Sequence, residues 1–406
     1  MKILAIAYAC EPNRGSEPGV GWNWVRNMSR CDDIELSVIT RKNNKDVIDF
    51  FVKNNSEPDN IEFLYYDLPT SVLKHKHGDK NIKLFFTLWQ LGVVRYIKSG
   101  VKLEDYDYVW DFNFGSLALP SFVYKLKKKY VVGPVSTKES IPEPYLKKLS
   151  GKARMRYSVQ QFMRVHLWTN PFTWKTLKKS SLILTCNEMS RKYLPKGKKS
   201  IAVFHNGLDV EDSAHINIST SGSVRFVYAG RFIESKNLEL ALRAFARVAQ
   251  HTRDFCFEIY GSGPLKNKLI GLVASLKLED VVLFKDKVSQ KELFEIYQNR
   301  DCFVFPSLLE ISSTAVMEAM YFGMIPVCLD INCMEYILDN DCVMKVPNVS
   351  PEVDEVKFAD ALMKVIQTKS DLLNKKQQCH KYAAKHFLWS EKKEEIEKVA
   401  HYMENM

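Results

Sequence analysis

The chain of 406 residues is 46% apolar and 12% aromatic, so it is too long for one hydrophobic core and apolar enough to build two. No run of 18 or more apolar residues occurs, and residues 1–8 lead into Glu11 and Arg14 without a cleavage-like site, which argues against a membrane-spanning helix and a signal peptide. Nine scattered cysteines without a Cys-x-x-Cys pair favour a reducing cytosol and argue against structural zinc.

The net charge of +10 is unevenly distributed along the chain. Residues 1–200 carry 34 basic and 19 acidic side chains, or +15, whereas residues 201–406 carry 24 and 29, or −5. Residues 151–200 alone hold twelve basic side chains and one acidic side chain. Such a block is most often a solvated surface, and its other candidate partners are an anionic membrane, a phosphorylated acceptor and nucleic acid. No DNA- or RNA-binding motif supports nucleic acid.

The first element is a predicted buried strand at residues 2–8, followed by a loop at 9–21 and a helix that opens at Trp22. Gly19 and Gly21 in this loop would let backbone N–H groups approach a phosphate or a sugar closely. A plain turn is the alternative, because the loop does not match the Gly-x-Gly-x-x-Gly fingerprint of dinucleotide sites.

Further strands of a first sheet are predicted at residues 34–39, 61–66, 106–112, 130–135, 181–185 and 201–204. An aromatic-rich segment at residues 82–93 follows a basic stretch, and core packing is its default interpretation, with contact to a bilayer as the alternative. Asp111 lies near the end of the predicted strand 106–112, where its plain interpretation is a strand-end residue.

The second half alternates regularly between strands and helices after a linker near residues 205–223. Strands are predicted at 224–229, 255–260, 281–284 and 302–305, and helices at 237–250, 265–276, 290–298 and 314–322. This alternation predicts a parallel, doubly wound sheet. The tail from Ser350 is predicted to be helical.

The stretch 301–330 carries the candidate chemistry of this half as a strand, a loop, a helix and a second strand. Ser312, Ser313 and Thr314 are good N-cap residues, and a phosphate would suit the helix terminus that they open. A pyrophosphate there would leave Glu318 to accept hydrogen bonds from a ribose and Glu310 to accept them from a second polyol. The alternative is that Glu310 caps the helix and Glu318 is a solvated helix position.

Two cations follow the predicted strand that ends at Gly230. Arg231 and Lys236 can both reach an anion. Read as isolated residues they would be surface charges. No convincing set of metal ligands occurs in the sequence.

Four motifs resemble, in the same order, those of retaining, nucleotide-sugar-dependent glycosyltransferases of the GT-B fold in family four, the glycosyl transferases group 1. They are Phe204-His205-Asn206-Gly207-Leu208-Asp209, then Ala229-Gly230-Arg231 with Lys236, then Tyr260-Gly261-Ser262-Gly263-Pro264-Leu265, and finally Glu310 followed after seven residues by Glu318-Ala319. The resemblance covers the second half of the chain well and the first half in patches.

The resemblance implies two Rossmann-like doubly wound domains that face each other across a cleft. The expected ranges are an acceptor-binding domain at 1–205, a nucleotide-sugar-binding domain at 206–385 and a last helix at 386–406 that crosses back near residues 387–390. The stretch 16–22 looks like a variant from members that build bacterial surface polysaccharides such as capsule and lipopolysaccharide.

The implied activity is transfer of a hexosyl or N-acetylhexosaminyl group from a UDP- or GDP-linked sugar, with retention of anomeric configuration and without a cofactor. The acceptor would be lipid-linked or a growing polysaccharide, and the enzyme would be cytoplasmic, in peripheral contact with anionic lipid at the inner face of the cytoplasmic membrane. The alternatives are a nucleotide-sugar epimerase of the same fold and a non-catalytic basic binding protein.

The family's functional positions map onto residues of this chain. The catalytic positions are Glu310, Arg231, Lys236 and Asp111, and the donor-binding positions are Gly19, Gly21, Gly230, Gly261, Gly263, Pro264, Ser312, Ser313, Thr314 and Glu318. Asp111 stands where many members have a histidine. The tripeptide 311–313 replaces a commoner glycine-containing one, and Asp286 stands where a glycine is usual, so these departures bear on the choice of donor.

Overall fold

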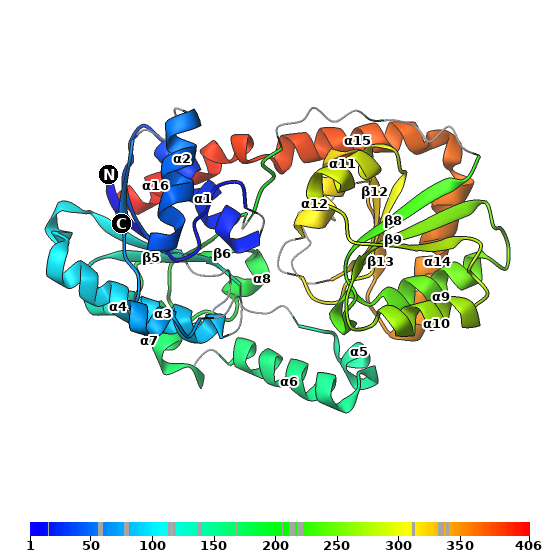
Figure 1. Cartoon of the computed structure of the whole chain (residues 1–406), viewed down its shortest axis with the longest axis horizontal. Coiled ribbons are helices and arrows are strands. Elements are labelled where there is room, and N and C mark those ends of the chain that lie inside the picture. Colours follow the sequence, from blue (N-terminus) through cyan, green and yellow to red (C-terminus); the bar gives the residue numbers. More distant parts are fainter. Residues whose placement is uncertain are drawn as a thin grey trace. The chain divides into compact units, whose positions relative to one another are not determined.

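The computed structural model describes the whole chain except residues 15, 56–59, 77–80, 113–114, 116–118, 137–139, 167–168, 205, 211–215, 217–221, 311–312, 332–336 and 338–340. The chain divides into two compact units (Figure 1). The first unit comprises residues 1–138, 162–207 and 389–406, and the second comprises residues 139–161 and 208–388.

The described strands of the first unit form a seven-stranded parallel sheet in the order β3-β2-β1-β4-β5-β6-β7. They are β1 (Lys2–Ala7), β2 (Glu35–Thr40), β3 (Ile61–Tyr65), β4 (Tyr108–Phe112), β5 (Tyr130–Val135), β6 (Leu182–Thr185) and β7 (Ser200–Ala202). The helices of this unit are α1 (Ser16–Ser29), α2 (Lys45–Asn55), α3 (Thr70–Leu73), α4 (Ile82–Gly100), α7 (Pro171–Lys179), α8 (Glu188–Arg191) and α16 (Lys393–Glu404).

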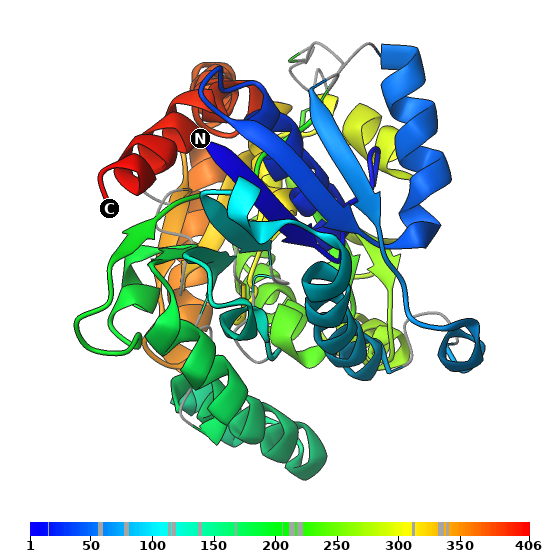
Figure 2. The same ribbon diagram turned by 90° about the vertical axis from the view of Figure 1, so that its left-hand side faces the viewer.

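Apolar side chains cover both faces of this sheet, as expected of a parallel sheet. One core cluster joins the sheet to α1, α2 and α16, and a second joins it to α4 and α7. Figure 2 shows α16 (red) and α4 (dark teal) on opposite sides of the strands. The last helix is also fixed by a hydrogen bond of 2.8 Å from the Tyr108 hydroxyl to the carbonyl of Met403.

The second unit contains a six-stranded parallel sheet in its described part, in the order β10-β9-β8-β11-β12-β13. Its strands are β8 (Val224–Arg231), β9 (Phe255–Ser262), β10 (Val282–Lys285), β11 (Cys302–Phe305), β12 (Ile325–Asp330) and β13 (Met344–Pro347). Its helices are α5 (Glu143–Lys148), most of α6 (Gly151–Val165), α9 (Leu238–Val248), α10 (Lys266–Ser275), α11 (Gln290–Gln298), α12 (Thr314–Tyr321), α14 (Pro351–Gln367) and α15 (Leu372–His386). Helix α14 packs on α9, and α12 packs on α15.

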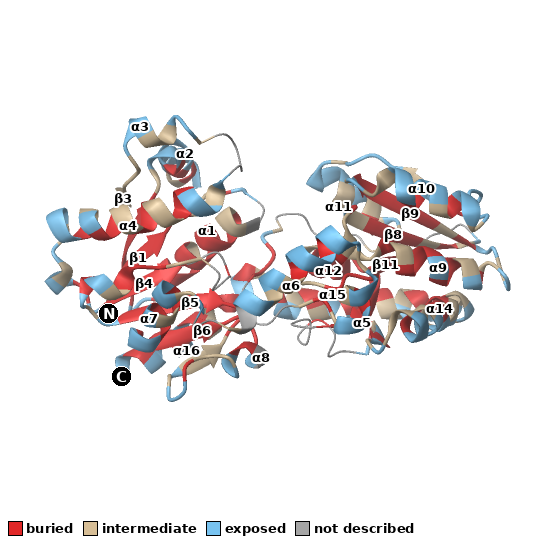
Figure 3. Cartoon of the chain, turned by 90° about the horizontal axis from the view of Figure 1, so that it is seen from below, coloured by how far each residue is buried: buried red, intermediate tan, exposed pale blue. Residues whose placement is uncertain are grey.

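The burial pattern explains the near-continuous apolar runs of the central strands. Every residue of β11 and almost every residue of β12 is buried, as Figure 3 shows in red for the strands of both units. The predicted strands and helices of the second half are all present, with ends that differ by a few residues. The predicted doubly wound parallel sheets are therefore confirmed.

The aromatic segment at residues 82–93 is a core element. It forms the first part of α4, and Phe86, Trp89 and Val93 are completely buried against the sheet of the first unit. The core-packing interpretation is confirmed, and these rings are not free to contact a bilayer.

The loop predicted at residues 9–21 is shorter than expected, because α1 begins at Ser16 and not at Trp22. Pro18 is compatible with the first turn of a helix, where the missing N–H would have no partner. Gly19 and Gly21 therefore lie in a helix. A Cβ atom on Gly19 would come within 1.8 Å of the Arg14 carbonyl oxygen, and one on Gly21 within 2.0 Å of that of Ala9. Both glycines let the preceding loop pack directly against α1.

The sequence places residues 139–161 in the first domain, whereas their contacts group them with the second unit. The Tyr145 hydroxyl on α5 donates a hydrogen bond of 2.6 Å to Asp354 Oδ2, and Lys148 forms an ion pair with Glu352. The chain passes to the first unit again at Trp389, within the stretch 387–390 named as the crossing point.

Candidate functional site

A pocket of about 540 Å³ opens in the second unit where β8 and β9 end. It is lined by Ala229, Gly230, Arg231, Ile233, Tyr260, Gly261, Ser262, Gly263, Pro264, Lys287, Val288, Leu293, Tyr297 and Ala315. In the sheet, β9 and β10 follow β8 on one side, and β11, β12 and β13 lie on its other side. The strand order therefore changes direction between β8 and β11, next to this pocket. Ligands of open α/β sheets bind outside the carboxyl ends of the strands at such a switch point.

Glycines shape one wall of this pocket because other residues would not fit there. Gly261 and Gly263 have φ angles of 142° and 157°, which side chains of L-residues rarely adopt. A Cβ atom on Gly261 would lie 1.9 Å from the carbonyl oxygen of Gly230, and one on Gly263 would lie 2.5 Å from that of Phe232. The ends of β8 and β9 can therefore approach each other and leave backbone exposed to the pocket.

Arg231 lies at the exposed end of β8 and lines the pocket. The structure finds no ion-pair partner for its guanidinium group among the residues that it describes. Its backbone is fixed by a hydrogen bond of 3.0 Å from the buried Tyr228 hydroxyl to the Arg231 carbonyl. A fixed backbone with an available guanidinium group suits an incoming anion.

Lys236 and Glu310 form an ion pair near the same strand ends. The pair is mostly shielded from solvent, since 18% of the Lys236 side chain and 12% of the Glu310 side chain are exposed. The buried Ser307 hydroxyl also donates a hydrogen bond of 2.6 Å to Glu310 Oε1. Glu310 Oε1 is thus held by two side chains, those of Lys236 and Ser307. The alternative that it is only a helix cap does not describe these contacts.

Helix α12 begins at Thr314 next to the pocket, which its residue Ala315 lines. Ser313 occupies the predicted N-cap position, but its side chain makes no capping hydrogen bond. Backbone N–H groups of the first turn have no partner within a helix, so an anion at this terminus would be stabilised. Ser312 lies outside the described residues.

Glu318 lies one turn further along α12 and is 8% exposed, so the alternative of a solvated helix position is wrong. Gln290 on α11 donates a hydrogen bond of 2.6 Å to Glu318 Oε1. Burial raises the pKa of Glu318 to about 7, and the bond from Gln290 offsets only part of this effect. A carboxyl group that is only partly ionised at neutral pH can both donate and accept hydrogen bonds.

Tyr297 on α11 lines the pocket and was missed by the sequence reasoning. Its ring is completely buried, yet its hydroxyl group has no hydrogen-bond partner among the described groups. Burial, followed by the nearby carboxyl of Glu318, raises the pKa of Tyr297 well above its ordinary value. A tyrosine at this helical spacing looks like any core residue, so no sequence signal could have singled it out.

The predicted site residues of the first unit are Gly19, Gly21 and Asp111. Asp111 lies in β4 and is completely buried, and burial raises its pKa to about 6. Gln90 Nε2 donates a hydrogen bond of 3.3 Å to Asp111 Oδ1. The catalytic role of Asp111 stays a prediction, as do the roles of the glycines in α1.

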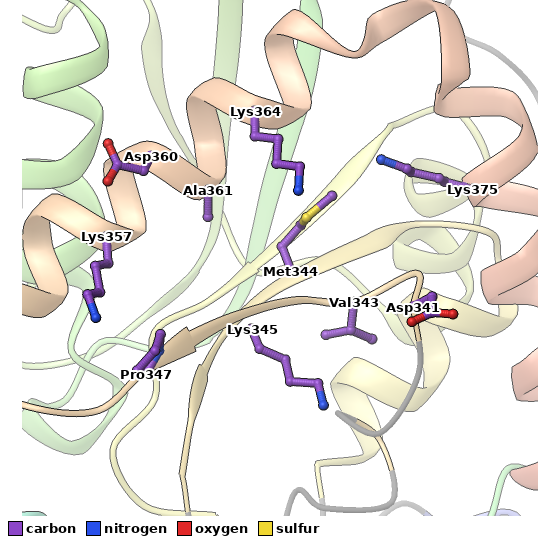
Figure 4. A pocket seen from close by; sticks show the side chains of 10 residues that line it. All are labelled: Asp341, Val343, Met344, Lys345, Pro347, Lys357, Asp360, Ala361, Lys364 and Lys375. Atoms are coloured by element: carbon purple, nitrogen blue, oxygen red, sulfur yellow. The ribbon is translucent and has the colours of Figure 1, made fainter.

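A separate pocket of about 690 Å³ lies beside β13 and α14 (Figure 4). Its charged lining residues are Lys345, Lys357, Lys364, Lys375, Asp341 and Asp360. It holds none of the predicted site residues. Among the described residues, no group of three or more His, Cys, Asp or Glu side chains could hold a metal ion.

Comparison with known proteins supports the motif assignment. Residues 210–386 match the family model described as Glycosyl transferases group 1. The glycosyltransferase YqgM of Bacillus subtilis is 28% identical over 148 residues, which are 36% of this chain and 41% of that protein. WcaL of Salmonella typhimurium, named for colanic acid biosynthesis, is 29% identical over 136 residues, 32% of this chain and 33% of that one.

A third relative, from Campylobacter jejuni, is named as an N-acetylgalactosaminyltransferase that acts on a diphospho-undecaprenol-linked sugar. It is 27% identical over 134 residues, 32% of this chain and 35% of that protein. The chain therefore spans between about a quarter and two fifths of the length of the curated relatives that it matches.

Solved structures resemble almost the whole chain at low identity. Sucrose-phosphate synthase of Thermosynechococcus elongatus has a TM-score of 0.67 at 13% identity, over 99% of this chain and 98% of that one. TarM has a TM-score of 0.65 at 11% identity over 100% and 99%, and WaaG has 0.58 at 14% over 99% of both chains. These likenesses confirm the predicted GT-B fold class of two Rossmann-like domains.

Proposed function

We propose that this chain is a glycosyltransferase that moves a sugar from a nucleotide-sugar donor to an acceptor. One observation carries the proposal: the pocket at the ends of β8 and β9 brings together Arg231 and the glycine turn at 261–263, beside the start of α12. The turn exposes backbone, the helix terminus favours negative charge and the arginine is available to an anion. These are the features that a nucleoside diphosphate requires.

The proposed chemistry is stabilisation of the departing diphosphate. As the glycosidic bond breaks, negative charge develops on the oxygen of the β-phosphate. The guanidinium group of Arg231 and the ammonium group of Lys236 would face that charge, and each fixed contact of this kind can lower the barrier by about 3 kcal/mol. No protein side chain needs to transfer a proton to the phosphate, because a diphosphate is already a good leaving group.

The carboxyl groups of Glu318 and Glu310 would bind different parts of the donor in this proposal. Glu318, beside the pocket wall formed by α11, would hold the ribose hydroxyls through its partly protonated carboxyl. Glu310, held by Lys236 and Ser307, would accept hydrogen bonds from the donor sugar. Donor binding would then replace part of the Lys236–Glu310 ion pair with contacts to the ligand.

The proposed sugar, base, stereochemistry, acceptor and location follow from the resemblance to the family. We propose transfer of a hexosyl or N-acetylhexosaminyl group from a UDP- or GDP-linked donor, with retention of configuration. The printed names of WcaL and of the Campylobacter relative support a polysaccharide or lipid-linked acceptor. For this chain we also propose a cytoplasmic location with peripheral contact to anionic membrane. Within the described helices, none combines the length and apolar character that a bilayer crossing requires.

Thermal shift with a panel of nucleotides tests the donor assignment. Nucleoside diphosphates should raise the Tm of the whole chain more than the matching monophosphates do, because the second phosphate faces Arg231 and α12. The preferred base then selects the sugar nucleotides to be tried for donor hydrolysis in the absence of acceptor. A chain that no nucleoside diphosphate stabilises would refute the proposal. NMR of the transferred sugar would decide between retention and inversion.

A further inference from the structure

Helix α6 (Gly151–Val165) presents an exposed apolar stripe. Met155, Val159, Phe162 and Met163 are 68%, 54%, 53% and 44% exposed. Their spacing of three and four residues places them on one side of a helix. Exposed apolar residues are ordinary when they are single, but four on one face form a patch that calls for a partner.

The other side of α6 is the face that packs on protein. Ala153 and Tyr157, four residues apart, are buried, and their positions lie opposite the exposed stripe on a helical projection. The preceding helix is firmly attached, because Asp354 accepts hydrogen bonds both from Tyr145 and from the backbone N–H groups of Val349 and Ser350. The stripe is therefore on the outer face of a docked helix.

Basic residues border this stripe at Lys152 and Arg156, and acidic residues are missing from the helix sequence. Between residues 151 and 165 the chain carries Lys152, Arg154, Arg156 and Arg164 and no Asp or Glu. Lys152 projects on the same side as the stripe. Arg156 lies beside it and reaches Glu234 only at 3.5 Å. An apolar face bordered by cations is typical of a helix that lies in a membrane interface.

The positive charge of α6 also argues against a second copy of the chain as the partner of this stripe. If a second copy of the chain docked through this stripe, two helices of charge +4 would meet, and like charges across an interface are unfavourable. Phospholipid headgroups of negative charge complement the same cations. The other strongly exposed apolar residues, such as Phe50 on α2 and Leu84 on α4, are not part of a comparable basic stripe.

We propose that the outer face of α6 lies in the interfacial layer of an anionic bilayer, with Met155, Val159 and Phe162 among the acyl chains. The inference rests on the proposed membrane contact and gives it a surface, but it does not depend on which reaction the chain catalyses. It also assigns the membrane contact to α6 and not to the aromatic segment of α4, whose rings are buried in the core of the first unit.

The test is co-sedimentation of the whole chain with vesicles of phosphatidylcholine alone and of phosphatidylcholine mixed with phosphatidylglycerol. The parent should bind the anionic vesicles and not the neutral ones. A variant with Met155→Gln, Val159→Gln and Phe162→Gln should bind the anionic vesicles at least about tenfold more weakly, because most of the apolar contact is gone. The matched control changes the exposed Val47, Phe50 and Leu84 to Gln and should bind like the parent.

A charge variant separates the two contributions. Lys152→Gln with Arg154→Gln should reduce binding at low salt and flatten its salt dependence, since fewer cations are screened. If the stripe variant binds like the parent, or if neutral vesicles retain the parent equally well, the inference is overturned. Analytical ultracentrifugation tests the other occupant: a dimer that the stripe variant disrupts would assign the face to a second copy.

Nucleotide binding provides the independent readout. Circular dichroism should show the stripe variant folded, and its thermal shift with a nucleoside diphosphate should equal that of the parent. If no nucleotide stabilises either protein while the vesicle result holds, the proposed reaction fails and the membrane surface stands. If nucleotide binds and the vesicle difference is absent, the reaction stands and the membrane surface fails.

Discussion

The glycines at the end of β9 and those at the start of α1 serve different purposes although all of them permit close contact. Gly261 and Gly263 have positive φ angles and line a pocket, so their backbone is available to a ligand. Gly19 and Gly21 lie in a helix, and their missing Cβ atoms make room for the chain's own loop at residues 9–14. A glycine cluster after a strand therefore indicates a binding site only where open space adjoins it.

The largest expected effect concerns the cations beside the glycine pocket of the second unit. Arg231→Ala and Lys236→Ala should each lower kcat by roughly two orders of magnitude, because each removes charge that faces the departing diphosphate. Steady-state kinetics with the preferred donor measures this.

The control for these variants is Arg253→Ala. Arg253 pairs with Asp280 just before β9, at the amino-terminal end of the strand and so away from the pocket, and its loss should leave kcat unchanged. If Arg231→Ala or Lys236→Ala also leaves kcat unchanged, that residue does not belong to the site.

A second comparison uses two buried carboxyl groups whose pKa is raised, one in each unit. The pKa of Glu318 is raised to about 7 and that of Asp111 to about 6, so the folded chain binds more protons than the unfolded chain in the range between the ordinary and the raised values. Stability should therefore fall as pH rises from about 4.5 to 7, by on the order of 2 kcal/mol for Glu318.

Glu318→Gln and Asp111→Asn should each flatten this dependence, since the amide does not titrate. Denaturant unfolding between pH 5 and 7.5 would show it as a smaller decrease in the free energy of unfolding. A parent whose stability rises over that range, or variants with the same slope as the parent, would contradict the environments described for these groups.

The two pairs of glycines give the third prediction. Gly21→Ala should destabilise the chain by about 2 kcal/mol, because its Cβ would meet a backbone oxygen that cannot move aside easily. Nucleoside diphosphate affinity of the remaining folded protein should not change.

Gly263→Ala should also destabilise, and it should weaken nucleotide binding in addition, since its backbone lines the pocket. Tm and calorimetric Kd, measured on both variants, separate the two roles. An affinity loss in Gly21→Ala that equals the loss in Gly263→Ala would place α1 in the nucleotide site after all.

Sequence reasoning recovered the second unit better than the first for a physical reason. The motifs around Gly230, Gly261 and Glu318 follow β8, β9 and β11, which are neighbours in the sheet, so their meeting follows from the topology of a parallel sheet. In the first unit, the helix start at Ser16 was hidden by three glycines and a proline that usually mark loops. The docking of residues 139–161 on the second unit depends on a long-range contact, Tyr145 with Asp354, that has no local signal.

The fourth prediction separates the two carboxylates of the pocket region. Glu318→Ala should weaken binding of a free nucleoside diphosphate by about tenfold, the equivalent of about 1.4 kcal/mol, because the ribose loses its partner. Glu310→Ala should leave that affinity unchanged, since Glu310 is proposed to address the donor sugar, and it should weaken binding of the sugar nucleotide instead. Calorimetry with both ligands decides this, and equal losses for the free diphosphate would sink the division of roles.

The smallest expected effect is also the one that the sequence could not have suggested. Tyr297 keeps a buried hydroxyl group without a hydrogen-bond partner among the described residues, at the wall of the pocket. A buried polar group that lacks a partner costs about 1 kcal/mol or more, so Tyr297→Phe should stabilise the free protein by about that amount. If the hydroxyl is kept for the nucleotide, the same variant should bind the diphosphate about fivefold more weakly, because the ligand loses a hydrogen bond worth about 1 kcal/mol. The variant should therefore have a higher Tm without ligand and a higher Kd from calorimetry, that is, a more stable protein and a weaker complex.

Leu293→Met, at another lining position of the same helix, is the matched control and should alter neither quantity by more than a small amount. A more stable variant with unchanged affinity would mean that the hydroxyl faces the core and not the ligand, and Tyr297 would then be a packing residue like the others of α11.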